Sequence, residues 1–214
     1  MSKTLFEKTK LSLIIILCSI LYWIYMIPSL PDSIPMQVED DGSVIWSANK
    51  YIAALLTIVI MTIIYLIMLY KPKYKNMDKG RRDAYENVYS IIINLVIFLV
   101  FVAILIVIFN ANGFSFDMNR LILLITGTLL IVIGNYYQKI PFNSPIGIKT
   151  PWIVSSSKIW SKTHRTASIV FLLLGFVIFL SGLIYPSLEK YVFIIIVIGF
   201  LIPLLYSFYL THQD

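Results

Sequence analysis

The sequence of residues 88–109 is VYSIIINLVIFLVFVAILIVIF, a run of 22 residues without a single Asp, Glu, Lys or Arg. A transmembrane helix needs about 20 predominantly apolar residues to cross a hydrocarbon core of about 30 Å. A charge at the centre of such a helix costs about 2.5–3.5 kcal/mol on insertion scales, so its absence fits a lipid environment. This stretch therefore predicts a membrane-spanning helix.

Five similar apolar runs lie on either side of it, at residues 11–27, 51–70, 120–137, 166–185 and 191–210. Of these five runs, only the one at residues 120–137 contains a charged residue, Arg120, at its boundary. The whole chain is 59% hydrophobic and 13% charged, whereas soluble domains contain about 25% charged residues. The sequence therefore predicts an all-α bundle of six transmembrane helices.

Basic residues predict the orientation of this bundle. Of the 17 Lys and Arg residues, all but Lys50, Arg120 and Lys190 lie in the N-terminal tail, the second loop or the fourth loop. Lys and Arg are enriched in cytoplasmic loops, so both termini are predicted to be cytoplasmic. The net charge of +6 is explained by this topology, and no direct binding of nucleic acid is expected.

The longest polar interruption after residue 88 is GNYYQKIPFNSPIGIKTPWIVSSSKIWSKTHR, residues 134–165, which we call the signature loop. Turns are predicted at Asn143, Ser144, Pro145, Gly147 and Pro151. Ser155 or Ser156 can cap a short helix that runs to about Arg165. We expect this helix to lie at the cytoplasmic membrane interface. One of its faces would gather Trp152, Ile159, Trp160 and Thr163.

The signature loop resembles the loop motif of the SdpI family, bacterial membrane proteins that give immunity to a secreted toxin. The resemblance lies in Asn135, Tyr136, Lys139, Asn143, Gly147, Ile148, Lys149, Thr150, Pro151, Trp152, Ser155, Ser156, Trp160, Lys162, Thr163, His164 and Arg165. Three positions depart from the family pattern: Lys149 replaces the usual Arg, Ile153 the usual Thr, and Ser157 an acidic residue. Because Lys cannot reproduce the bidentate contacts of a guanidinium group, a partner bound at position 149 would be bound differently.

The segment between the first two helices, residues 28–50, resembles the small N-terminal module that often precedes the SdpI domain. The similar residues are Leu30, Pro31, Asp32, Ile34, Pro35, Gly42 and Lys50, while Gln37 stands where that module usually has His. The two prolines favour extended or turn geometry. A compact acidic loop outside the cell is therefore expected. Its candidate toxin-facing residues are Pro31, Asp32, Pro35, Gln37, Glu39, Asp40, Asp41 and Gly42.

The domain organisation follows from the same features. Residues 1–70 are predicted to form a transmembrane hairpin with its outer loop at 28–50, and residues 71–87 to form a basic cytoplasmic linker. Residues 88–214 would form the SdpI-like domain of four membrane helices.

Little in the sequence indicates catalysis. His164 and His212 are the only histidines, no carboxylate lies between Asp117 and Glu189, and the single Cys and two scattered His have no zinc-ligand spacing. We expect no enzyme activity, no cofactor and no metal. A transporter of unknown substrate is a rival interpretation, as is a lipid-interacting or partner-binding membrane subunit.

Coupled transport usually requires charged residues or broken helices near the bilayer midplane. The sequence offers there only polar residues that can bond between helices or to carbonyls of their own helices: Thr57, Thr62, Asn94, Thr126, Thr128 and Ser181. Glycines at 127, 134, 175, 182 and 199 permit close helix packing, although they follow no strict repeat.

The resemblance implies two activities for the chain. One is protection against a membrane-active secreted toxin. The other is sequestration of a transcriptional repressor at the inner face of the membrane. Its expected partners are therefore a peptide or protein toxin, the lipid bilayer and a cytoplasmic repressor.

Overall fold

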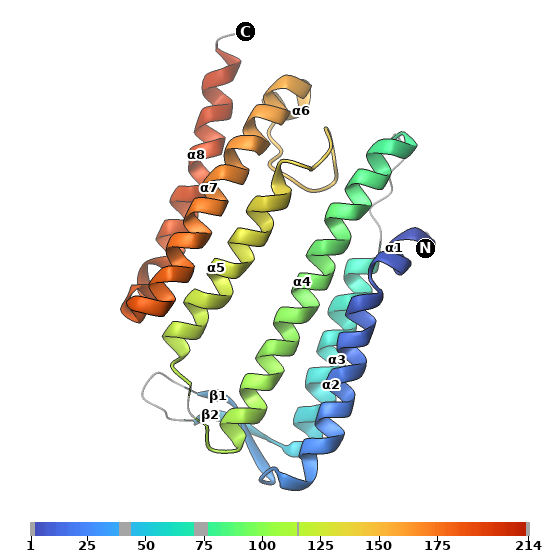
Figure 1. Ribbon diagram of the computed structural model, residues 1–214, viewed down its shortest axis with the longest axis vertical. Coiled ribbons are helices and arrows are strands. Elements are labelled where there is room, and N and C mark those ends of the chain that lie inside the picture. The colour runs from blue at the N-terminus through green and yellow to red at the C-terminus, as the bar shows by residue number, and fades with distance from the viewer. Residues whose placement is uncertain (1–2, 39–43, 71–76, 115, 213–214) are drawn as a thin grey trace. The chain divides into compact units, whose positions relative to one another are not determined.

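The computed structural model describes residues 3–38, 44–70, 77–114 and 116–212 (Figure 1). Within these residues, six helices have the length and apolar composition needed to cross a membrane, which confirms the predicted all-α polytopic bundle. The long helices are α2 (Lys10–Met26), α3 (Lys50–Leu69), α4 (Lys79–Ala111), α5 (Met118–Tyr137), α7 (Ser157–Ile184) and α8 (Val192–Thr211). Shorter elements are α1 (Lys3–Lys8), η1 (Ile27–Ser29), β1 (Ser33–Val38), β2 (Val44–Asn49), α6 (Pro151–Ser155) and η2 (Pro186–Tyr191).

The start of α4 lies nine residues before the apolar run that predicted it. The carboxylate of Asp78 accepts hydrogen bonds from the backbone N–H of Arg81, at 2.8 Å, and from its guanidinium Nε, at 2.7 Å. These contacts satisfy a backbone donor of the first helical turn, and they hold the pKa of Asp78 below its ordinary value. As a result, residues 79–87 of the expected linker are helical, while residues 71–76 lie outside the described residues.

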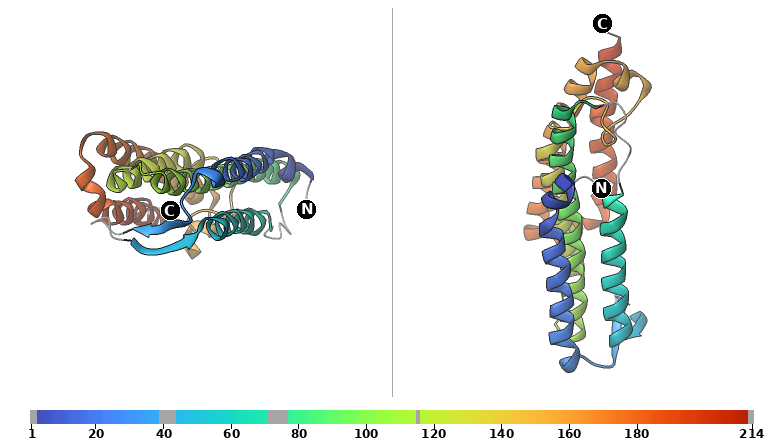
Figure 2. Two further views of the ribbon diagram at one scale, coloured as in Figure 1. Left: turned by 90° about the horizontal axis from the view of Figure 1, so that it is seen from below. Right: turned by 90° about the vertical axis from the view of Figure 1, so that its right-hand side faces the viewer.

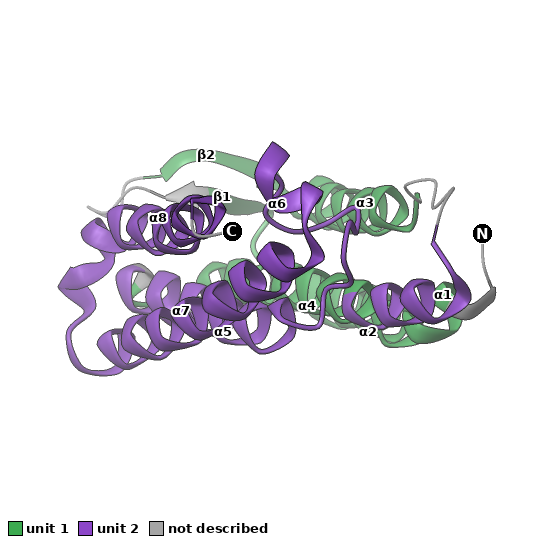
Figure 3. Ribbon diagram, turned by 90° about the horizontal axis from the view of Figure 1, so that it is seen from above, with its two compact units in different colours: residues 1–71, 89–118 green, residues 72–88, 119–214 purple. Residues whose placement is uncertain are grey.

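The chain divides into two compact units (Figure 3). Unit 1 comprises residues 1–71 and 89–118, and unit 2 comprises residues 72–88 and 119–214. Each unit is a set of residues that pack mainly against one another. Most of α4 packs with α2 and α3, so the units differ from the domain boundary that the sequence predicted at residue 88. The functional boundary near residues 71–87 stays a prediction.

Unit 1 has a continuous apolar core along its three long helices. The core residues are Leu5, Trp23, Leu30, Ile34, Ala48, Ala53, Ala54, Met61, Tyr65, Leu69, Ile93, Ile97, Ile104 and Ile108. The outward faces of α2 and α3 are apolar as well, as expected for helices that contact lipid.

A polar network joins the helices of unit 1 near the start of α2. The side-chain oxygen of Asn94 on α4 accepts hydrogen bonds from the hydroxyl and the backbone N–H of Ser12, at 2.6 and 3.2 Å. Its amide donates to the carbonyl of Lys8 at 3.1 Å. Thr9, between α1 and α2, lies 3.1 Å from the hydroxyl of Tyr65 on α3. The expected bonding between helices is thus confirmed for Asn94. The hydroxyls that instead donate to carbonyls of their own helices are those of Thr57, Thr62, Thr128 and Ser181.

The segment between α2 and α3 contains a β-hairpin that was not predicted from the sequence (Figure 2). β1 and β2 pair antiparallel, with Ile34 opposite Ala48 and both side chains buried. The register shifts between Pro35 and Gln37, which fits the position of a proline that has no N–H to donate to a ladder. The extended geometry expected from the prolines is therefore confirmed, and pairing of the two strands is added to it.

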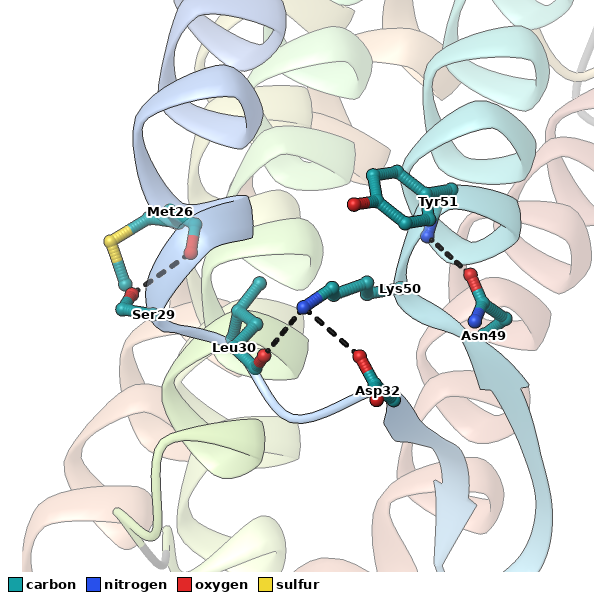
Figure 4. A network of polar contacts seen from close by, with 7 residues as sticks. All are labelled: Met26, Ser29, Leu30, Asp32, Asn49, Lys50 and Tyr51. Atoms are coloured by element: carbon teal, nitrogen blue, oxygen red, sulfur yellow. Dashed lines mark hydrogen bonds and ion pairs between the residues drawn. The ribbon is translucent and has the colours of Figure 1, made fainter.

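A lysine holds the base of this hairpin (Figure 4). The ammonium group of Lys50 donates to the carbonyl of Leu30 at 3.2 Å and pairs with the carboxylate of Asp32 at 3.1 Å. The backbone N–H of Lys50 also donates to the carbonyl of Asp32, at 3.1 Å. Next to it, the side chain of Asn49 accepts from the N–H of Tyr51 and caps α3. Leu30, Asp32 and Lys50, which belong to the family resemblance, therefore have a structural role here.

In unit 2, α5 and α7 lie side by side (Figure 1), and their backbones approach closely at glycines. A Cβ added to Gly127 on α5 would lie 2.6 Å from the backbone nitrogen of Phe179 on α7. One added to Gly134 would lie 2.6 Å from the backbone nitrogen of Leu172. The partner number on α7 falls by seven as the number on α5 rises by seven, so the two helices run antiparallel.

The same interface includes contacts from α7 to α5. A Cβ added to Gly175 would lie 2.7 Å from the backbone nitrogen of Ile131. The hydroxyl of Ser168 donates to the carbonyl of Gly134 at 2.5 Å. We call this interface the glycine seam. It fixes the register in which the end of α5 meets the first part of α7, where the signature loop is placed.

Candidate functional site

The signature loop begins where α5 ends. The N–H groups of Lys139 and Ile140 donate to the carbonyls of Tyr136 and Tyr137, which closes the last turn. Asn143 then has a φ of 55° and Gly147 a φ of 121°, both in the left-handed region that favours Asn and Gly. The turns predicted at these two residues are confirmed.

The helix that follows differs in extent from the prediction. Ser156 accepts a hydrogen bond from the N–H of Ile159 and is the N-cap, as expected. The helix does not end near Arg165, however, because α7 continues without interruption to Ile184. Its first turns therefore belong to the fifth long helix. α6 is a separate short helix before it, and an interfacial position for either segment stays a prediction.

Three aromatic rings form a stack on α5 and α7. The imidazole of His164 lies between the indole of Trp160 and the phenol ring of Tyr137. Its ring centroid is 4.1 Å from that of Trp160 and 5.1 Å from that of Tyr137. The planes differ by only 16° and 15°. Trp160 and His164 are one helical turn apart on α7, so the helix itself places one ring over the other.

One hydrogen bond of His164 determines the tautomer of its neutral ring. Its Nδ1 lies 2.9 Å from the carbonyl oxygen of Trp160. Since a carbonyl oxygen only accepts, Nδ1 has the proton and donates, which leaves Nε2 with a lone pair. The side chain is 1% exposed, and Nε2 faces Gly147, so closely that a Cβ at position 147 would overlap it. Only glycine fits between the loop backbone and the imidazole.

The loop also contacts the other two rings of the stack. The indole N–H of Trp160 donates to the carbonyl of Ile140 at 3.2 Å. The ring of Phe142 meets that of Trp160 edge to face, with centroids 5.8 Å apart. The backbone of Ile148 also lies near the hydroxyl of Tyr137. Both halves of the loop therefore close over the rings, and we call this assembly the ring cluster: Tyr137, Trp160 and His164 with the loop residues that contact them.

Trp152 lies apart from the ring cluster. Its indole N–H donates to the hydroxyl of Ser207 on α8 at 3.0 Å, and its ring meets that of Phe208 at 5.7 Å. The prediction that Trp152 shares a helix face with Trp160 is wrong, because the extended backbone of Ser156 separates α6 from α7. Trp152 instead joins α6 to α8.

The predicted signature-loop residues fall into three groups by burial. Buried in the ring cluster or beside it are Trp160, Thr163 and His164. Partly buried residues are Tyr136, Gly147, Thr150 and Trp152. The third group is exposed and can contact a partner or lipid; it contains Asn135, Lys139, Asn143, Lys149, Pro151 and Arg165. Specific contacts with a partner therefore fit the third group, and the first group holds the loop in shape.

Several residues of the site were not predicted from the sequence. Tyr137, Ile140 and Phe142 complete the ring cluster, and Ser207 receives Trp152. Tyr137 lies one position from a residue of the family motif, and its place at the last helical turn, followed by polar residues, was the available signal. Ser207 had no such signal, because it is 55 positions from Trp152.

The predicted outer-loop residues belong to unit 1. Pro31 and Asp32 are exposed at the base of the hairpin, Pro35 lies in β1, and the backbone of Gln37 pairs with that of Trp46. Glu39, Asp40, Asp41 and Gly42 lie outside the described residues. Among the described residues, no group of three His, Cys, Asp or Glu could hold a metal ion.

Comparisons with known proteins agree with these features. The family model described as the SdpI/YfhL protein family matches residues 139–207, which begin two residues after α5 and extend through the loop and α7 into α8. The chain is also 28% identical over 211 residues to the Immunity protein SdpI of Bacillus subtilis (strain 168), covering 94% of this chain and 92% of that protein. No solved structure matches the chain. This multi-pass cell-membrane protein is therefore similar to the SdpI/YfhL protein family over residues 139–207, and to a protein named Immunity protein SdpI along nearly its whole length.

Proposed function

We propose that this protein protects its own cell from a secreted toxin that acts on the cytoplasmic membrane. The observation that supports this most is the similarity to a protein named Immunity protein SdpI along nearly the whole of both chains. The action is binding rather than catalysis. Shared helices alone would say little about function, but the family match includes the loop from Lys139 onward together with Trp160 and His164 of the ring cluster.

The proposed mechanism has two parts. The outer hairpin captures the toxin, with Asp32, Gln37, Glu39, Asp40 and Asp41 as candidate contacts, and the signature loop responds on the inner side. As a finer proposal, the exposed residues of that loop also recruit a cytoplasmic transcriptional repressor when toxin is bound. The basic side chains of Lys139 and Lys149 are exposed and suit such a contact.

The test of the main proposal is protection of a toxin-sensitive cell. The protein is expressed in that cell, and membrane potential is recorded during challenge with the toxin. Maintained potential in expressing cells, with collapse in cells that have an empty vector, is the expected result. If the protein were a transporter of an unrelated substrate, the membrane potential of expressing cells would collapse as it does with the empty vector. That result would contradict the proposal.

The role of the loop is tested with exposed and buried variants side by side. Lys149→Ala removes an exposed side chain of the loop, and Lys190→Ala removes an exposed lysine in η2 as the matched control. Trp152→Ala and His164→Ala remove contacts that hold the loop. We expect protection to fall for the three loop variants at normal membrane abundance and to persist for the control. Full protection by all three would mean that the loop only anchors the bundle.

The capture step is tested separately. The triple variant Glu39→Gln, Asp40→Asn, Asp41→Asn should bind toxin more weakly, and the salt dependence of binding should decrease. Screening explains this expectation, since the Debye length falls from about 10 Å at 0.1 M salt to about 3 Å at 1 M. The single variant Asp117→Asn is the control. Unchanged binding in the triple variant, together with loss in Trp152→Ala, would move recognition to the inner loop.

A further inference from the structure

One face of α7 is exposed along the whole helix. At about 100° per residue, every third or fourth residue returns to the same face. The residues on this face are Lys158, Lys162, Arg165, Ile169, Leu173, Phe176, Leu180 and Leu183, and all are exposed. The opposite face contains Trp160, Ala167, Phe171 and Ile178 and is buried. The exposed face therefore meets the surroundings of the protein rather than its core.

The chemistry of this face changes within a single turn. The first three residues are cationic, and the five that follow are apolar and about half exposed, from 49% for Leu183 to 62% for Leu173. Arg165 and Ile169 are about 6 Å apart along the helix axis. From Arg165 to the exposed Tyr185, just past the end of α7, the axial distance is about 30 Å, which equals the thickness of a hydrocarbon core. These lengths are those expected of a helix that meets one membrane boundary beside Arg165 and the other beside an aromatic residue.

The cations on this face have few carboxylates near them in the sequence. No Asp or Glu occurs from residue 118 to residue 188, whereas Lys139, Lys149, Lys158, Lys162 and Arg165 all do. Lys139 lies over the ring of Tyr136, 4.6 Å from its centroid. For Lys162 and Arg165, which are exposed and one turn apart, an anion of the surroundings is the natural partner.

We propose that Lys162 and Arg165 bind the phosphate group of an anionic phospholipid whose acyl chains lie along Ile169 and Leu173. A lipid is favoured over a soluble anion because the cationic pair directly continues the apolar face of α7 on which acyl chains would lie. The guanidinium group of Arg165 offers paired donors for a phosphate, and Lys162 can extend its ammonium group to the same headgroup. This inference is independent of the proposed immunity function.

The test measures which lipids the protein retains. The purified full chain, in micelles that contain equal amounts of phosphatidylglycerol and phosphatidylcholine, is analysed by native mass spectrometry. The wild-type protein should be enriched in phosphatidylglycerol adducts. The variant Lys162→Gln, Arg165→Gln should lose most of this enrichment. A basic residue near an anionic surface contributes about fivefold in affinity, so the pair contributes roughly 30-fold if the effects add.

Two further variants make the result specific. Arg82→Gln, Lys190→Gln removes the same charge from exposed positions elsewhere, and it should keep the enrichment. The exchange Lys162→Arg, Arg165→Lys keeps the charge and should keep most of the enrichment. Equal loss in the Arg82 and Lys190 control, or no enrichment in the wild type, overturns the proposal. Unchanged enrichment in the Lys162 and Arg165 variant combined with lost protection would show that this surface binds a protein instead, and it overturns the proposal too.

Discussion

The rings of His164 and Trp160 lie one over the other, with centroids 4.1 Å apart and planes 16° from parallel. Both residues are on α7, and both also contact the loop that precedes it. The pair is therefore the point at which the turn-rich segment is joined to a membrane helix.

Removal of the indole should destabilise this part of the protein strongly. Trp160→Ala removes the stack and the hydrogen bond to the carbonyl of Ile140, and truncation of a buried Trp costs about 3–5 kcal/mol. His164→Phe keeps a ring in the stack and loses the Nδ1 hydrogen bond, for about 1 kcal/mol. Chemical unfolding in micelles measures both. The exposed Trp46 provides the control variant Trp46→Ala, and equal effects of the two Trp variants would contradict the role assigned to the stack.

Gly147→Ala should be more harmful than the same change at another glycine with positive φ. An alanine at position 147 has to adopt a φ of 121° and overlap Nε2 of His164. At Gly113, φ is 86° but no atom lies within 4 Å of the added Cβ. Both changes include backbone strain of about 1–3 kcal/mol, so the additional loss of unfolding free energy at position 147 reports the overlap together with the greater strain at its larger φ.

A double variant checks the cause of that difference. If the overlap with the imidazole matters, Gly147→Ala should cost less when His164 is already Ala. A cost that stays the same in both backgrounds would assign the whole effect to the backbone.

The glycine seam should not tolerate added volume. In Gly127→Ala the new Cβ meets backbone atoms of Phe179, which cannot rotate away, so a cost of about 1–3 kcal/mol is expected. Gly80→Ala is the matched control at a helical glycine, because its nearest neighbour is a side-chain oxygen of Asp78 at 3.6 Å. That change should be neutral or stabilising. Thermal unfolding in micelles compares them, and a tolerated Gly127→Ala would show that the helices separate easily.

Lys50 should matter more than Asp32 for the outer hairpin. The side chain of Lys50 is 14% exposed and also bonds the carbonyl of Leu30, whereas that of Asp32 is 89% exposed. An exposed ion pair contributes about 0–1 kcal/mol, so Asp32→Asn should lower the unfolding free energy by no more than about 1 kcal/mol. Lys50→Met should cost more, because the carbonyl of Leu30 loses its partner. The reverse order would mean that the ion pair, not the carbonyl contact, holds the hairpin.

Both termini should face the cytoplasm. This expectation rests on the distribution of Lys and Arg between alternate loops. A phosphatase that is active only outside the cell should be inactive when fused after Asp214 and active when inserted after Asp41. Activity at the C-terminal fusion would reverse the assigned orientation.

The six membrane helices could be predicted because a lipid environment imposes its composition on every stretch that crosses it. Runs such as 88–109 are recognisable without any knowledge of their neighbours. The residues at which helices begin and end were harder to predict. α7 continues through Lys162 and Arg165 into the apolar run because nothing between Ser157 and Ile184 interrupts it, although the change from polar to apolar residues suggested a boundary.

The candidate site was predicted as a segment, and its geometry was not. Turns at Asn143 and Gly147 follow from local backbone preferences, and the structure has them. The stacking of Tyr137 on His164 joins residues 27 positions apart and depends on the packing of α5 against α7. Trp152 was placed beside Trp160 by counting along a helix that in fact ends at Ser155. Contacts between two elements can be predicted only when the fold is known. The periodicity of the sequence predicts only which residues share a face of one helix.

The closure of the loop over the rings has a consequence for its sensitivity to proteases. Turn-rich loops that connect helices are usually the first segments to be cut. Here Ile140, Ser144 and Ile148 are buried at intervals of four residues, so no long stretch of this loop is free to extend into the cleft of an enzyme. The intact protein should therefore survive limited digestion between Tyr137 and Thr150. Any event that lifts Gly147 from His164 should appear as a new cleavage in this segment.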